Sequence, residues 1–379
     1  MKNILIVAAE HSAENYGSKI VEQFTQSDHK VSFFGTGGNE LKKKGVDIIV
    51  HNRELSIVGI VEVLSSILKI RKVMNILLDT AVKKRADAAI LIDYPDFNLR
   101  LAKKLKKAGI PVYYYISPTI WAWRYSRINI IRKYVDHMFI IFPFEKEIYK
   151  REKIPFTYTG HPLLPSIKIT EERENFRKKY GIRNNEKVLV LLPGSRLSEV
   201  RSLLPVMLES VKLLNDRTKI RVMILKADNI NIEEINSILK IHGSVTGIMD
   251  QEERYNLFNS SDAALASCGT SNLELAVCGL PFAAVYKVNK LSYFLGKGFL
   301  KISLYSIVNI LLEKEVVKEL IQKDLTPLNC ADEIFSILQI PAKREIQKTE
   351  FKKLTNLLSF DKSPFEIIYH KLISLISNI

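Results

Sequence analysis

The sequence is poor in cysteine and has no long apolar run. Its 379 residues include only 3 cysteines, at Cys268, Cys278 and Cys330. Their spacing fits no metal site, and the odd number favours a reducing cytoplasm over a disulfide framework. No segment approaches the roughly 18 to 20 apolar residues that a membrane-spanning helix needs. The apolar start of the chain ends at Glu10, which predicts a buried first strand instead of a signal peptide.

Low-complexity tracts and nucleic-acid motifs are also missing. The formal net charge of +15 would suit a nucleic acid, an anionic membrane surface or a phosphorylated small molecule. Basic clusters at 42–44, 83–85 and 103–107 fall on probable helices, where solvated faces explain them. No Cys/His finger or other recognition motif accompanies these clusters, so we expect no nucleic-acid partner.

Apolar runs alternate with helical patterns along most of the chain. Its length and 47% hydrophobic content predict a soluble protein of two domains. The predicted strands cover residues 4–8, 31–34, 88–92, 112–116 and 138–142, then 188–192, 221–225, 244–248, 263–266 and 282–285. This order predicts an α/β protein with parallel sheets, divided by a linker within 162–180. Two doubly wound domains facing across a cleft would bind ligands at the carboxyl ends of their strands.

The predicted strand at 263–266 ends in a turn of small residues before a helix. Gly269 permits close approach of a ligand, and free N–H groups at the helix start attract an anion such as a diphosphate. Glu274 follows within the first turns, where its carboxylate could accept hydrogen bonds from a ribose. An ordinary turn with Thr270 or Ser271 as the helix N-cap explains the same residues.

A second polar turn, Gly194-Ser195-Arg196, follows the predicted strand at 188–192. Gly194 gives close backbone approach, and Arg196 carries a planar set of donors suited to a diphosphate. A helix cap by Ser195 and a surface pair between Arg196 and Glu199 are the simpler explanations. Several such turns at successive strand ends favour a cleft that binds a phosphorylated ligand.

Polar residues also follow two predicted strands of the first half. Glu10 and Ser12 follow residues 4–8, and Ser12 would serve as a helix N-cap. Asp93 and Asp96 flank a proline after residues 88–92. These carboxylates suit a turn and a helix cap, or a general base at the carboxyl end of a strand.

The two tryptophans of the chain lie close together, at Trp121 and Trp123, beside Arg124. Core packing explains one tryptophan, whereas two with an arginine favour an amphipathic binding edge. Residues 55–72 are apolar over much of a helical circumference and end in basic residues, as do residues 293–301. The first segment suits a helix buried between layers, or one that enters a membrane interface with its basic end at anionic headgroups.

Taken together, these motifs resemble those of the lipid-A-disaccharide synthases, inverting glycosyltransferases with two Rossmann-like domains in the GT-B architecture. The resemblance covers residues 1–327. Its motifs are Ala-Glu-His-Ser at 9–12, Ser-Ile-Val-Gly-Ile-Val-Glu-Val-Leu at 56–64, Ile-Asp-Tyr-Pro-Asp-Phe-Asn at 92–98, Ser-Pro-Thr-Ile-Trp-Ala-Trp-Arg at 117–124, Phe-Pro-Phe-Glu at 142–145, Gly-His-Pro at 160–162, Leu-Pro-Gly-Ser-Arg at 192–196, Gly-Thr-Ser-Asn-Leu-Glu at 269–274, and Asn309 with Glu-Leu-Ile-Gln at 319–322. The segments 56–64 and 117–124 are specific, whereas the two glycine turns fit many nucleotide-sugar enzymes.

The resemblance implies that UDP-2,3-diacylglucosamine is joined to 2,3-diacylglucosamine 1-phosphate by a β-1,6 bond, with release of UDP and without a cofactor or metal. It implies an acceptor domain at 1–165, a donor domain at 166–340, and a helical tail at 341–379 that in such proteins often packs back on the first domain. The UDP site would contain Gly194, Ser195, Arg196, Gly269, Thr270, Glu274 and Asn309. The acceptor site would contain Ser12, Asp93, Trp123 and Arg124. Asp96 would deprotonate the acceptor 6-hydroxyl, with Glu10 as the second candidate.

The same resemblance implies where the protein works. Moving an acyl chain out of a membrane costs about 0.8 kcal/mol for each CH₂, so unaided extraction of several chains is prohibitive. We therefore expect a cytoplasmic protein held peripherally on the inner face of the cytoplasmic membrane, in contact with anionic lipids.

The chain departs from the family pattern in its first turn, which is usually Gly-Glu-x-Ser-Gly-Asp. Ala9, Ala13 and Glu14 stand at the two glycines and the aspartate, Cys268 replaces a usual serine, and Val308 a usual proline. The loss of both glycines predicts a differently shaped acceptor loop. Another UDP-sugar transferase, a UDP-sugar 2-epimerase or a noncatalytic paralogue that binds UDP-sugar or lipid are the alternatives.

Overall fold

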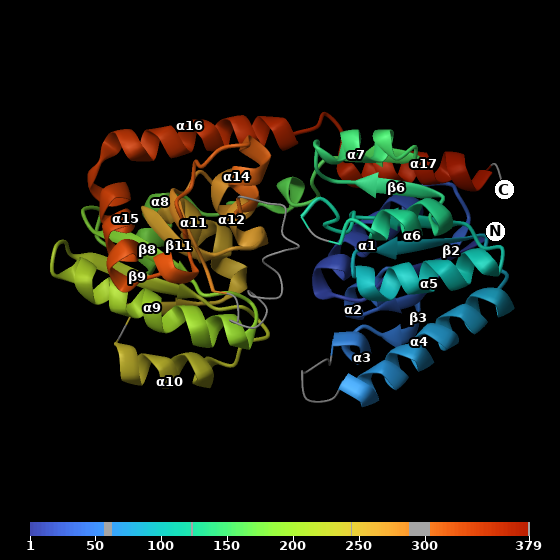
Figure 1. Cartoon of the computed structure of the whole chain (residues 1–379), viewed down its shortest axis with the longest axis horizontal. Helices are drawn as coiled ribbons and strands as arrows, with labels where there is room; N and C mark the ends of the chain where they lie inside the picture. Colours follow the sequence, from blue (N-terminus) through green and yellow to red (C-terminus); the bar gives the residue numbers. More distant parts are fainter. Residues whose placement is uncertain (57–62, 123, 244, 288–303, 378–379) are drawn as a thin grey trace. The chain divides into compact units, whose positions relative to one another are not determined.

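The computed structural model describes residues 1–56, 63–122, 124–243, 245–287 and 304–377. The chain divides into two compact units (Figure 1). Unit 1 contains Met1–Pro162 and Leu358–Ile379, and unit 2 contains Leu163–Leu357. The alternation of strands and helices expected from the sequence is confirmed, and each unit is built on one parallel sheet.

Unit 1 has a seven-stranded sheet in the order β3-β2-β1-β4-β5-β6-β7. The strands are β1 (Lys2–Ala8), β2 (Val31–Gly37), β3 (Asp47–His51), β4 (Ala88–Ile92), β5 (Val112–Tyr115), β6 (His137–Ile140) and β7 (Phe156–Tyr158). Val7 of β1 lies opposite Thr36 of β2 on one side and Leu91 of β4 on the other. Because the strand order reverses between β1 and β4, the loops after these two strands occupy the point where open α/β sheets bind ligands.

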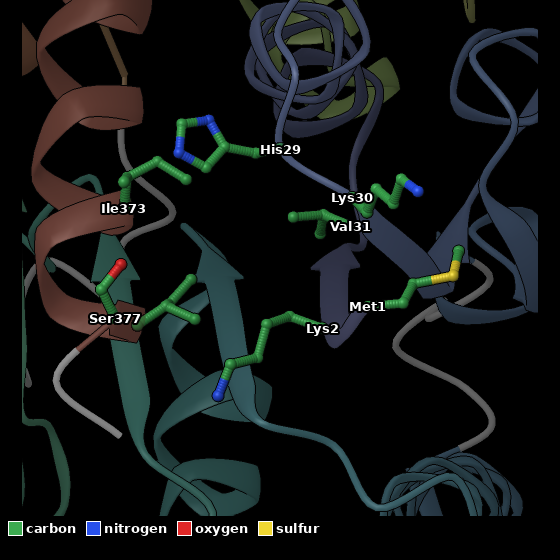
Figure 2. A pocket seen from close by; sticks show the side chains of 8 residues that line it. Met1, Lys2, His29, Lys30, Val31, Ile373 and Ser377 are labelled. Atoms are coloured by element: carbon green, nitrogen blue, oxygen red, sulfur yellow. The ribbon is translucent and has the colours of Figure 1, made fainter.

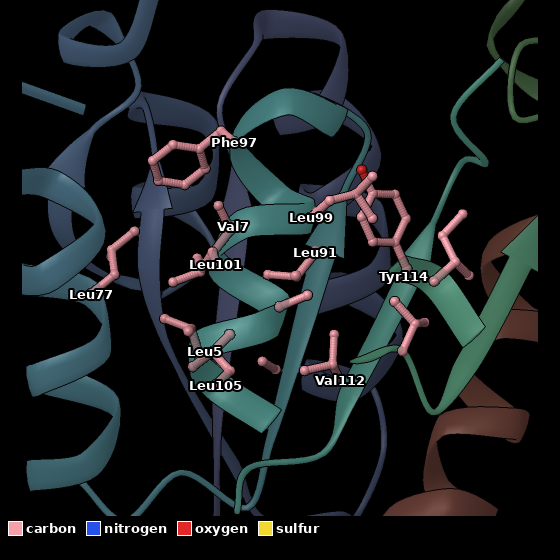
Figure 3. Close-up of a cluster of buried hydrophobic side chains, with 14 of the residues drawn as sticks. Leu5, Val7, Leu77, Leu91, Phe97, Leu99, Leu101, Leu105, Val112 and Tyr114 are labelled. Carbon is pink, nitrogen blue, oxygen red and sulfur yellow. The ribbon is translucent and has the colours of Figure 1, made fainter. Parts of the chain in front are cut away.

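Helices cover both faces of this sheet. They are α1 (His11–Thr25), α2 (Asn39–Lys43), α3 (Arg53–Ser56), α4 (Val63–Lys83), α5 (Pro95–Lys107), α6 (Arg127–Tyr134), α7 (Glu145–Arg151) and α17 (Pro364–Ser377). Alternate residues of a strand point to opposite faces, and here both faces are buried. Leu5 of β1 packs in one core cluster with Leu101 of α5 (Figure 3), whereas Ile6 packs in another with Leu372 of α17.

Unit 2 has a six-stranded sheet in the order β10-β9-β8-β11-β12-β13. Its strands are β8 (Lys187–Leu192), β9 (Ile220–Leu225), β10 (Gly247–Met249), β11 (Ala263–Ser267), β12 (Phe282–Tyr286) and β13 (Glu319–Ile321). Its helices are α8 (Arg173–Lys179), α9 (Leu197–Asn215), α10 (Ile232–His242), α11 (Arg254–Ser260), α12 (Thr270–Val277), α14 (Ile307–Leu312), α15 (Pro327–Gln339) and α16 (Pro341–Leu358). Short 3₁₀ turns are η2 (Leu164–Ser166), η3 (Gln251–Glu253) and η4 (Gln322–Asp324).

Three strands of the structure have no counterpart among the predicted ones. β3, β7 and β13 each form an edge of a sheet. β7 and β13 contain 3 residues each, and β3 begins with an exposed aspartate. Edge strands are often short and carry charged residues, so their hydrophobic runs do not stand out in the sequence.

The C-terminal helices divide between the units. α16 belongs to unit 2 up to its last residue, whereas α17 belongs to unit 1. α17 packs against α1, where the ring centroids of Tyr369 and Phe24 lie 4.9 Å apart (Figure 1). The expected tail at 341–379 is therefore two helices with different partners. No helix within the described part of the chain combines the length and apolarity needed to cross a bilayer.

Candidate active site

The turn between β8 and α9 in unit 2 is organised by Glu199. Its Oε2 accepts hydrogen bonds from the backbone N–H groups of Ser195 at 3.2 Å and Arg196 at 3.3 Å. Its Oε1 lies 3.1 Å from Nη1 of Arg196. Gly194 has a φ of 112°, and a Cβ there would fall 2.4 Å from Glu199 Oε2. Arg196, not Ser195, occupies the N-cap position of α9, and its side chain is 77% exposed.

The turn between β11 and α12 is open at its glycine. Gly269 is the N-cap residue in an extended conformation, and a Cβ there would meet no atom of the described residues within 4 Å. Neither Thr270 nor Ser271 is the N-cap, because α12 begins at Thr270 itself. Asn272 donates from Nδ2 to the carbonyl of Ser267 at 2.9 Å and so ties the helix to the strand end. The first N–H groups of α12 are therefore available to an anion.

Glu274 is buried in α12 and paired. Its Oε1 accepts from Nη1 of Arg254 at 2.9 Å and from the Tyr255 hydroxyl at 3.1 Å. Burial raises the pKa of the Glu274 carboxyl, and the charge of Arg254 opposes that rise. Both bonds go to Oε1, so Oε2 keeps its lone pairs for a ligand hydroxyl.

These turns of unit 2 lie side by side at the carboxyl ends of the strands, because β8, β11 and β12 are neighbours in the sheet. Burial raises the pKa of the Cys268 thiol, and the charges of Glu319 and Glu199 add to the rise. Tyr286, at the end of β12, also has a raised pKa, through burial first and then the charge of Glu199. Residues from three strand ends therefore lie within electrostatic reach of one another. Cys268, in place of the usual serine, is a largely buried neutral thiol at this point.

Asn309 lies in a different environment from the other predicted donor residues. It is fully buried in α14, and its Nδ2 donates to the carbonyl of Val317 at 2.7 Å and to Glu319 at 2.8 Å. Its Oδ1 accepts from the N–H groups of Val316 and Val317, both at 2.9 Å. All four hydrogen bonds of this amide are used within the protein. Asn309 thus supports the turn that leads to β13 and does not present its amide to a ligand.

In unit 1, Glu10 and Asp93 lie close together at the ends of neighbouring strands. Glu10 is the exposed N-cap residue of α1, and Ser12 is exposed within its first turn. Ser12 is therefore not the N-cap that the sequence favoured. Burial raises the pKa of Asp93 to about 6, and the charge of Glu10 adds to the rise. The structure thus brings together two of the predicted carboxylates.

The backbone at Asp93 is unusual. Asp93 and Tyr94 are consecutive non-glycine residues with φ values of 50° and 46°. The carbonyl of Asp93 accepts from the Tyr114 hydroxyl at 2.6 Å and from Nδ2 of Asn98 at 2.7 Å. Such left-handed residues cost about 1–3 kcal/mol each and persist where surrounding contacts hold them, often at functional sites. This turn delivers Asp96 at the start of α5.

Asp96 is exposed and held by two arginines. Its Oδ1 accepts from Nη2 of Arg127 at 2.6 Å and from Nη1 of Arg124 at 3.3 Å. The Asp96 side chain is 65% exposed, that of Arg124 53%, and that of Arg127 only 8%. Both bonds again go to a single oxygen, which leaves Oδ2 open to solvent or substrate.

The tryptophan segment packs over the ends of β5 and β6. Trp123, the predicted acceptor contact, lies outside the described residues, as do 57–62 and 288–303 of the two apolar and basic segments. Trp121 contacts Phe144 edge to face, with ring centroids 5.2 Å apart. Phe144 in turn stacks on Phe142 at 5.5 Å. Trp121, Phe144 and Phe142 therefore form a packed aromatic layer, and Arg124 has a positive φ of 51°.

Glu145, the residue after Phe144, is a buried acid that is 1% exposed. Its Oε2 accepts from the N–H groups of Ile141 at 3.2 Å and Phe142 at 3.0 Å. Ser117 hydrogen bonds to it and lies 2.7 Å from the Tyr149 hydroxyl. Burial raises the pKa of Glu145 to about 7, against the effect of these hydrogen bonds. Glu145 thus links the loop after β5 to the loop after β6.

Glu14, one of the departures from the family pattern, has a clear structural role. Its carboxylate is 4% exposed and accepts from the Glu40 N–H and from Nδ2 of Asn52, both at 2.8 Å. Ala9 and Ala13 are buried, and neither has a positive φ. The backbone of this turn therefore accommodates alanine at both positions, and the prediction that the loop differs in shape from that of the family stays a prediction.

Several residues around the candidate site were not expected from the sequence. Arg127 reaches Asp96 from α6, and Arg254 and Tyr255 reach Glu274 from α11. Arg127 lies three residues beyond Arg124, so the sequence gave a weak indication of its role. Arg254 lies far from Glu274 in the chain, and the sequence gave no indication that the two would pair. A separate pocket of about 240 Å³ lies between the start of β1 and α17, lined by Lys2, His29 and Ile373 among others (Figure 2). It is at the amino ends of the strands, away from the candidate residues.

Comparison with solved structures shows the fold. The whole chain superposes on UDP-GlcNAc 2-epimerase from Neisseria meningitidis bound to UDP-GlcNAc, with a TM-score of 0.68, 14% identity, and coverage of 99% of this chain and 100% of that one. It also matches MurG from Acinetobacter baumannii, with a TM-score of 0.56, 14% identity and full coverage of both chains. At this identity the likeness shows the fold alone, which is the GT-B fold of two Rossmann-like domains.

The family follows from sequence. A model of the family described as lipid-A-disaccharide synthetase matches residues 4–368, and the chain belongs to that family of glycosyltransferases. It is 38% identical to the lipid-A-disaccharide synthase of Myxococcus xanthus (strain DK1622) over 343 residues, which cover 90% of this chain and 89% of the relative. It is 36% identical to that of Syntrophus aciditrophicus (strain SB) over 373 residues, 94% of each chain.

Proposed function

We propose that the protein transfers the sugar of UDP-2,3-diacylglucosamine to the 6-hydroxyl of 2,3-diacylglucosamine 1-phosphate, forming a β-1,6 bond and releasing UDP. Membership of the lipid-A-disaccharide synthetase family across residues 4–368 carries this proposal. The two sets of polar turns, one in each unit, supply the groups that such a transfer requires.

UDP binds at the strand ends of unit 2. The free N–H groups at the start of α12 and the exposed guanidinium of Arg196 face the diphosphate and stabilise the charge that develops as it departs. Gly269 leaves room for the phosphates to approach the backbone. The Oε2 atom of Glu274 accepts from a ribose hydroxyl while Arg254 holds Oε1. Gly194, Ser195 and Thr270 shape these turns through their backbones.

Asp96 acts as the general base. Its exposed carboxylate has one oxygen held by arginine and the other open, so Oδ2 takes the proton of the acceptor 6-hydroxyl. The hydroxyl oxygen then forms the bond to the anomeric carbon from the face opposite UDP, as the bond to the diphosphate breaks. Asp93 is more deeply buried and bonded through its backbone, which suits it to shaping the acceptor pocket with Glu10 and Ser12.

The acyl chains stay in the membrane during the reaction. α4 presents Leu68, which is 67% exposed, beside the exposed Lys69, Arg71 and Lys72. An apolar side chain flanked by cations suits the interface of an anionic leaflet. We place this end of α4 against the inner face of the cytoplasmic membrane.

An assay in detergent micelles with both lipid substrates tests the reaction, with the disaccharide 1-phosphate read by mass spectrometry. Asp96→Asn lowers turnover by about 10²–10⁴-fold, because a general base contributes that much. UDP affinity, measured by calorimetry, stays at the wild-type value, since the UDP groups lie in unit 2. Near-normal turnover in this variant would exclude Asp96, and Asp93→Asn and Glu10→Gln would then be compared. Wild-type protein that binds UDP but forms no disaccharide would favour a noncatalytic paralogue.

A further inference from the structure

The ion pair between Arg127 and Asp96 joins a buried cation to an exposed anion. Arg127 is the first residue of α6, and its guanidinium is 8% exposed, whereas the Asp96 carboxylate is 65% exposed. The distance from Nη2 to Oδ1 is 2.6 Å, slightly shorter than the usual range of about 2.7–2.9 Å for a charge-assisted N–H···O bond. A guanidinium is costly to bury unless it is paired and hydrogen bonded. The Asp96 carboxylate that pairs with Arg127 faces outward.

Arg127 also belongs to the network that shapes the turn before Asp96. Burial raises the pKa of the Tyr114 phenol, with Asp93 adding to the rise and Arg127 opposing it, so these groups surround one buried hydroxyl. That hydroxyl donates to the carbonyl of Asp93, in the left-handed turn. The carboxylate is therefore placed from two sides, by the backbone turn of α5 and by the guanidinium of α6.

Arg124 reaches the same oxygen in a different way. Its guanidinium is 53% exposed and its contact with Asp96 Oδ1 is 3.3 Å, longer by 0.7 Å than that of Arg127 (3.3 against 2.6 Å). The two arginines can therefore be compared directly. Arg127 is buried and close to Asp96, whereas Arg124 is exposed and farther from the same carboxylate.

We propose that Arg127 is a positioning residue for the reaction: it fixes Oδ1 of Asp96 so that Oδ2 faces the acceptor hydroxyl. The proposal rests on the function proposed above, and it assigns a role to a residue outside both predicted sites. Arg127 does not touch the substrate. It sets the orientation of the carboxylate, and a misplacement of about 1 Å at such a group can cost about 100-fold in rate.

Steady-state kinetics of Arg127→Met, Arg127→Lys and Arg124→Met in the micelle assay test this role. Arg127→Met lowers kcat by about 10–100-fold and leaves the KM of both substrates within about threefold, because orientation is lost and binding is kept. Arg127→Lys keeps the charge without the planar fork and recovers part of kcat. Arg124→Met instead raises the acceptor KM and changes kcat little. Lys133→Met, on the exposed side of α6, serves as the neutral control.

Chemical rescue separates positioning from a structural role. Methylguanidinium added to Arg127→Ala restores kcat in a concentration-dependent manner, and it has no effect on the wild-type protein. UDP affinity and the thermal midpoint of each variant are measured alongside. An unchanged kcat in Arg127→Met, or lost activity with a collapsed thermal midpoint and no rescue, would overturn the role of Arg127. Absence of disaccharide from the wild-type protein would instead reject the proposed function.

Discussion

Glu274 and Arg254 form an ion pair in which the carboxylate is buried and uses a single oxygen, with 2.9 Å between Oε1 and Nη1. The pair comes from two helices of unit 2, α11 and α12. A carboxylate fixed in this way has one oxygen with a set direction, which is what recognition of a ribose hydroxyl requires.

Glu274→Gln should therefore weaken UDP binding by about tenfold, the equivalent of one charge-assisted hydrogen bond. The loss should be smaller for 2′-deoxy-UDP, so the preference for UDP over the deoxy compound narrows. Calorimetric titration of both ligands measures this ratio. Tyr255→Phe is the matched control, because it removes a neighbouring hydroxyl and keeps the carboxylate. An unchanged ratio in Glu274→Gln would show that the carboxylate does not meet the ribose.

Glu14→Ala should lower the free energy of unfolding by about 1–3 kcal/mol. The change removes the buried carboxylate that accepts from the Glu40 N–H and the Asn52 amide. UDP binding should stay at the wild-type value, since these groups lie in unit 1. Urea unfolding gives the stability, with Glu22→Ala as a control, whose partially exposed pair with Lys44 is worth about 0–1 kcal/mol. Equal losses in the two variants would argue against the role assigned to Glu14.

Glu145→Gln should change how stability depends on pH. The pKa of Glu145 is raised by burial from 4.5 to about 7 in the folded protein. Protonated Glu145 therefore contributes to the free energy of unfolding. This contribution is fully present below pH 4.5 and is lost as the pH rises through about 7.

The wild-type protein should thus lose up to about 3 kcal/mol through this group between pH 4.5 and 8, because each tenfold change in proton affinity on folding is worth about 1.4 kcal/mol. The neutral amide of the variant should lack that slope. Urea unfolding at several pH values gives the free energy of unfolding of both proteins. As the pH rises, the variant should become more stable relative to the wild-type protein. Parallel stability curves would rule out titration of Glu145 in this range.

Leu68→Asp should weaken binding to anionic vesicles by about tenfold, because burial of a leucine contributes about 1.5–3 kcal/mol. Co-sedimentation with phosphatidylcholine vesicles, with and without phosphatidylglycerol, measures the effect. Ile241→Asp is the control, since Ile241 is 76% exposed on unit 2 without a comparable assigned role. The same loss from both variants, or none from Leu68→Asp, would remove α4 from the membrane contact.

Some of the candidate site follows from local sequence. Asp93 directly follows β4, Asp96 lies in the first turn of the next helix, and Glu274 lies in the helix after β11. In each unit, the loops after parallel strands meet on one side of the sheet. Others depend on contacts between distant segments. The buried amide of Asn309 is used by the turn at 316–317 and by Glu319, and no local pattern distinguishes this from a ligand contact.

The sequence by itself determined the alternation of strands and helices, and with it the fold class, because buried parallel strands need continuous apolar runs. The motifs could also be found in the sequence, because each lies in one short segment. Only the tertiary structure decided which oxygen of a carboxylate is held and which is open. Arg127 reaches Asp96, and Arg254 reaches Glu274, from separate helices. The tertiary structure also decided that α17 completes the core of unit 1. An amphipathic pattern indicates that one face of a helix is buried, but it does not indicate which element covers that face.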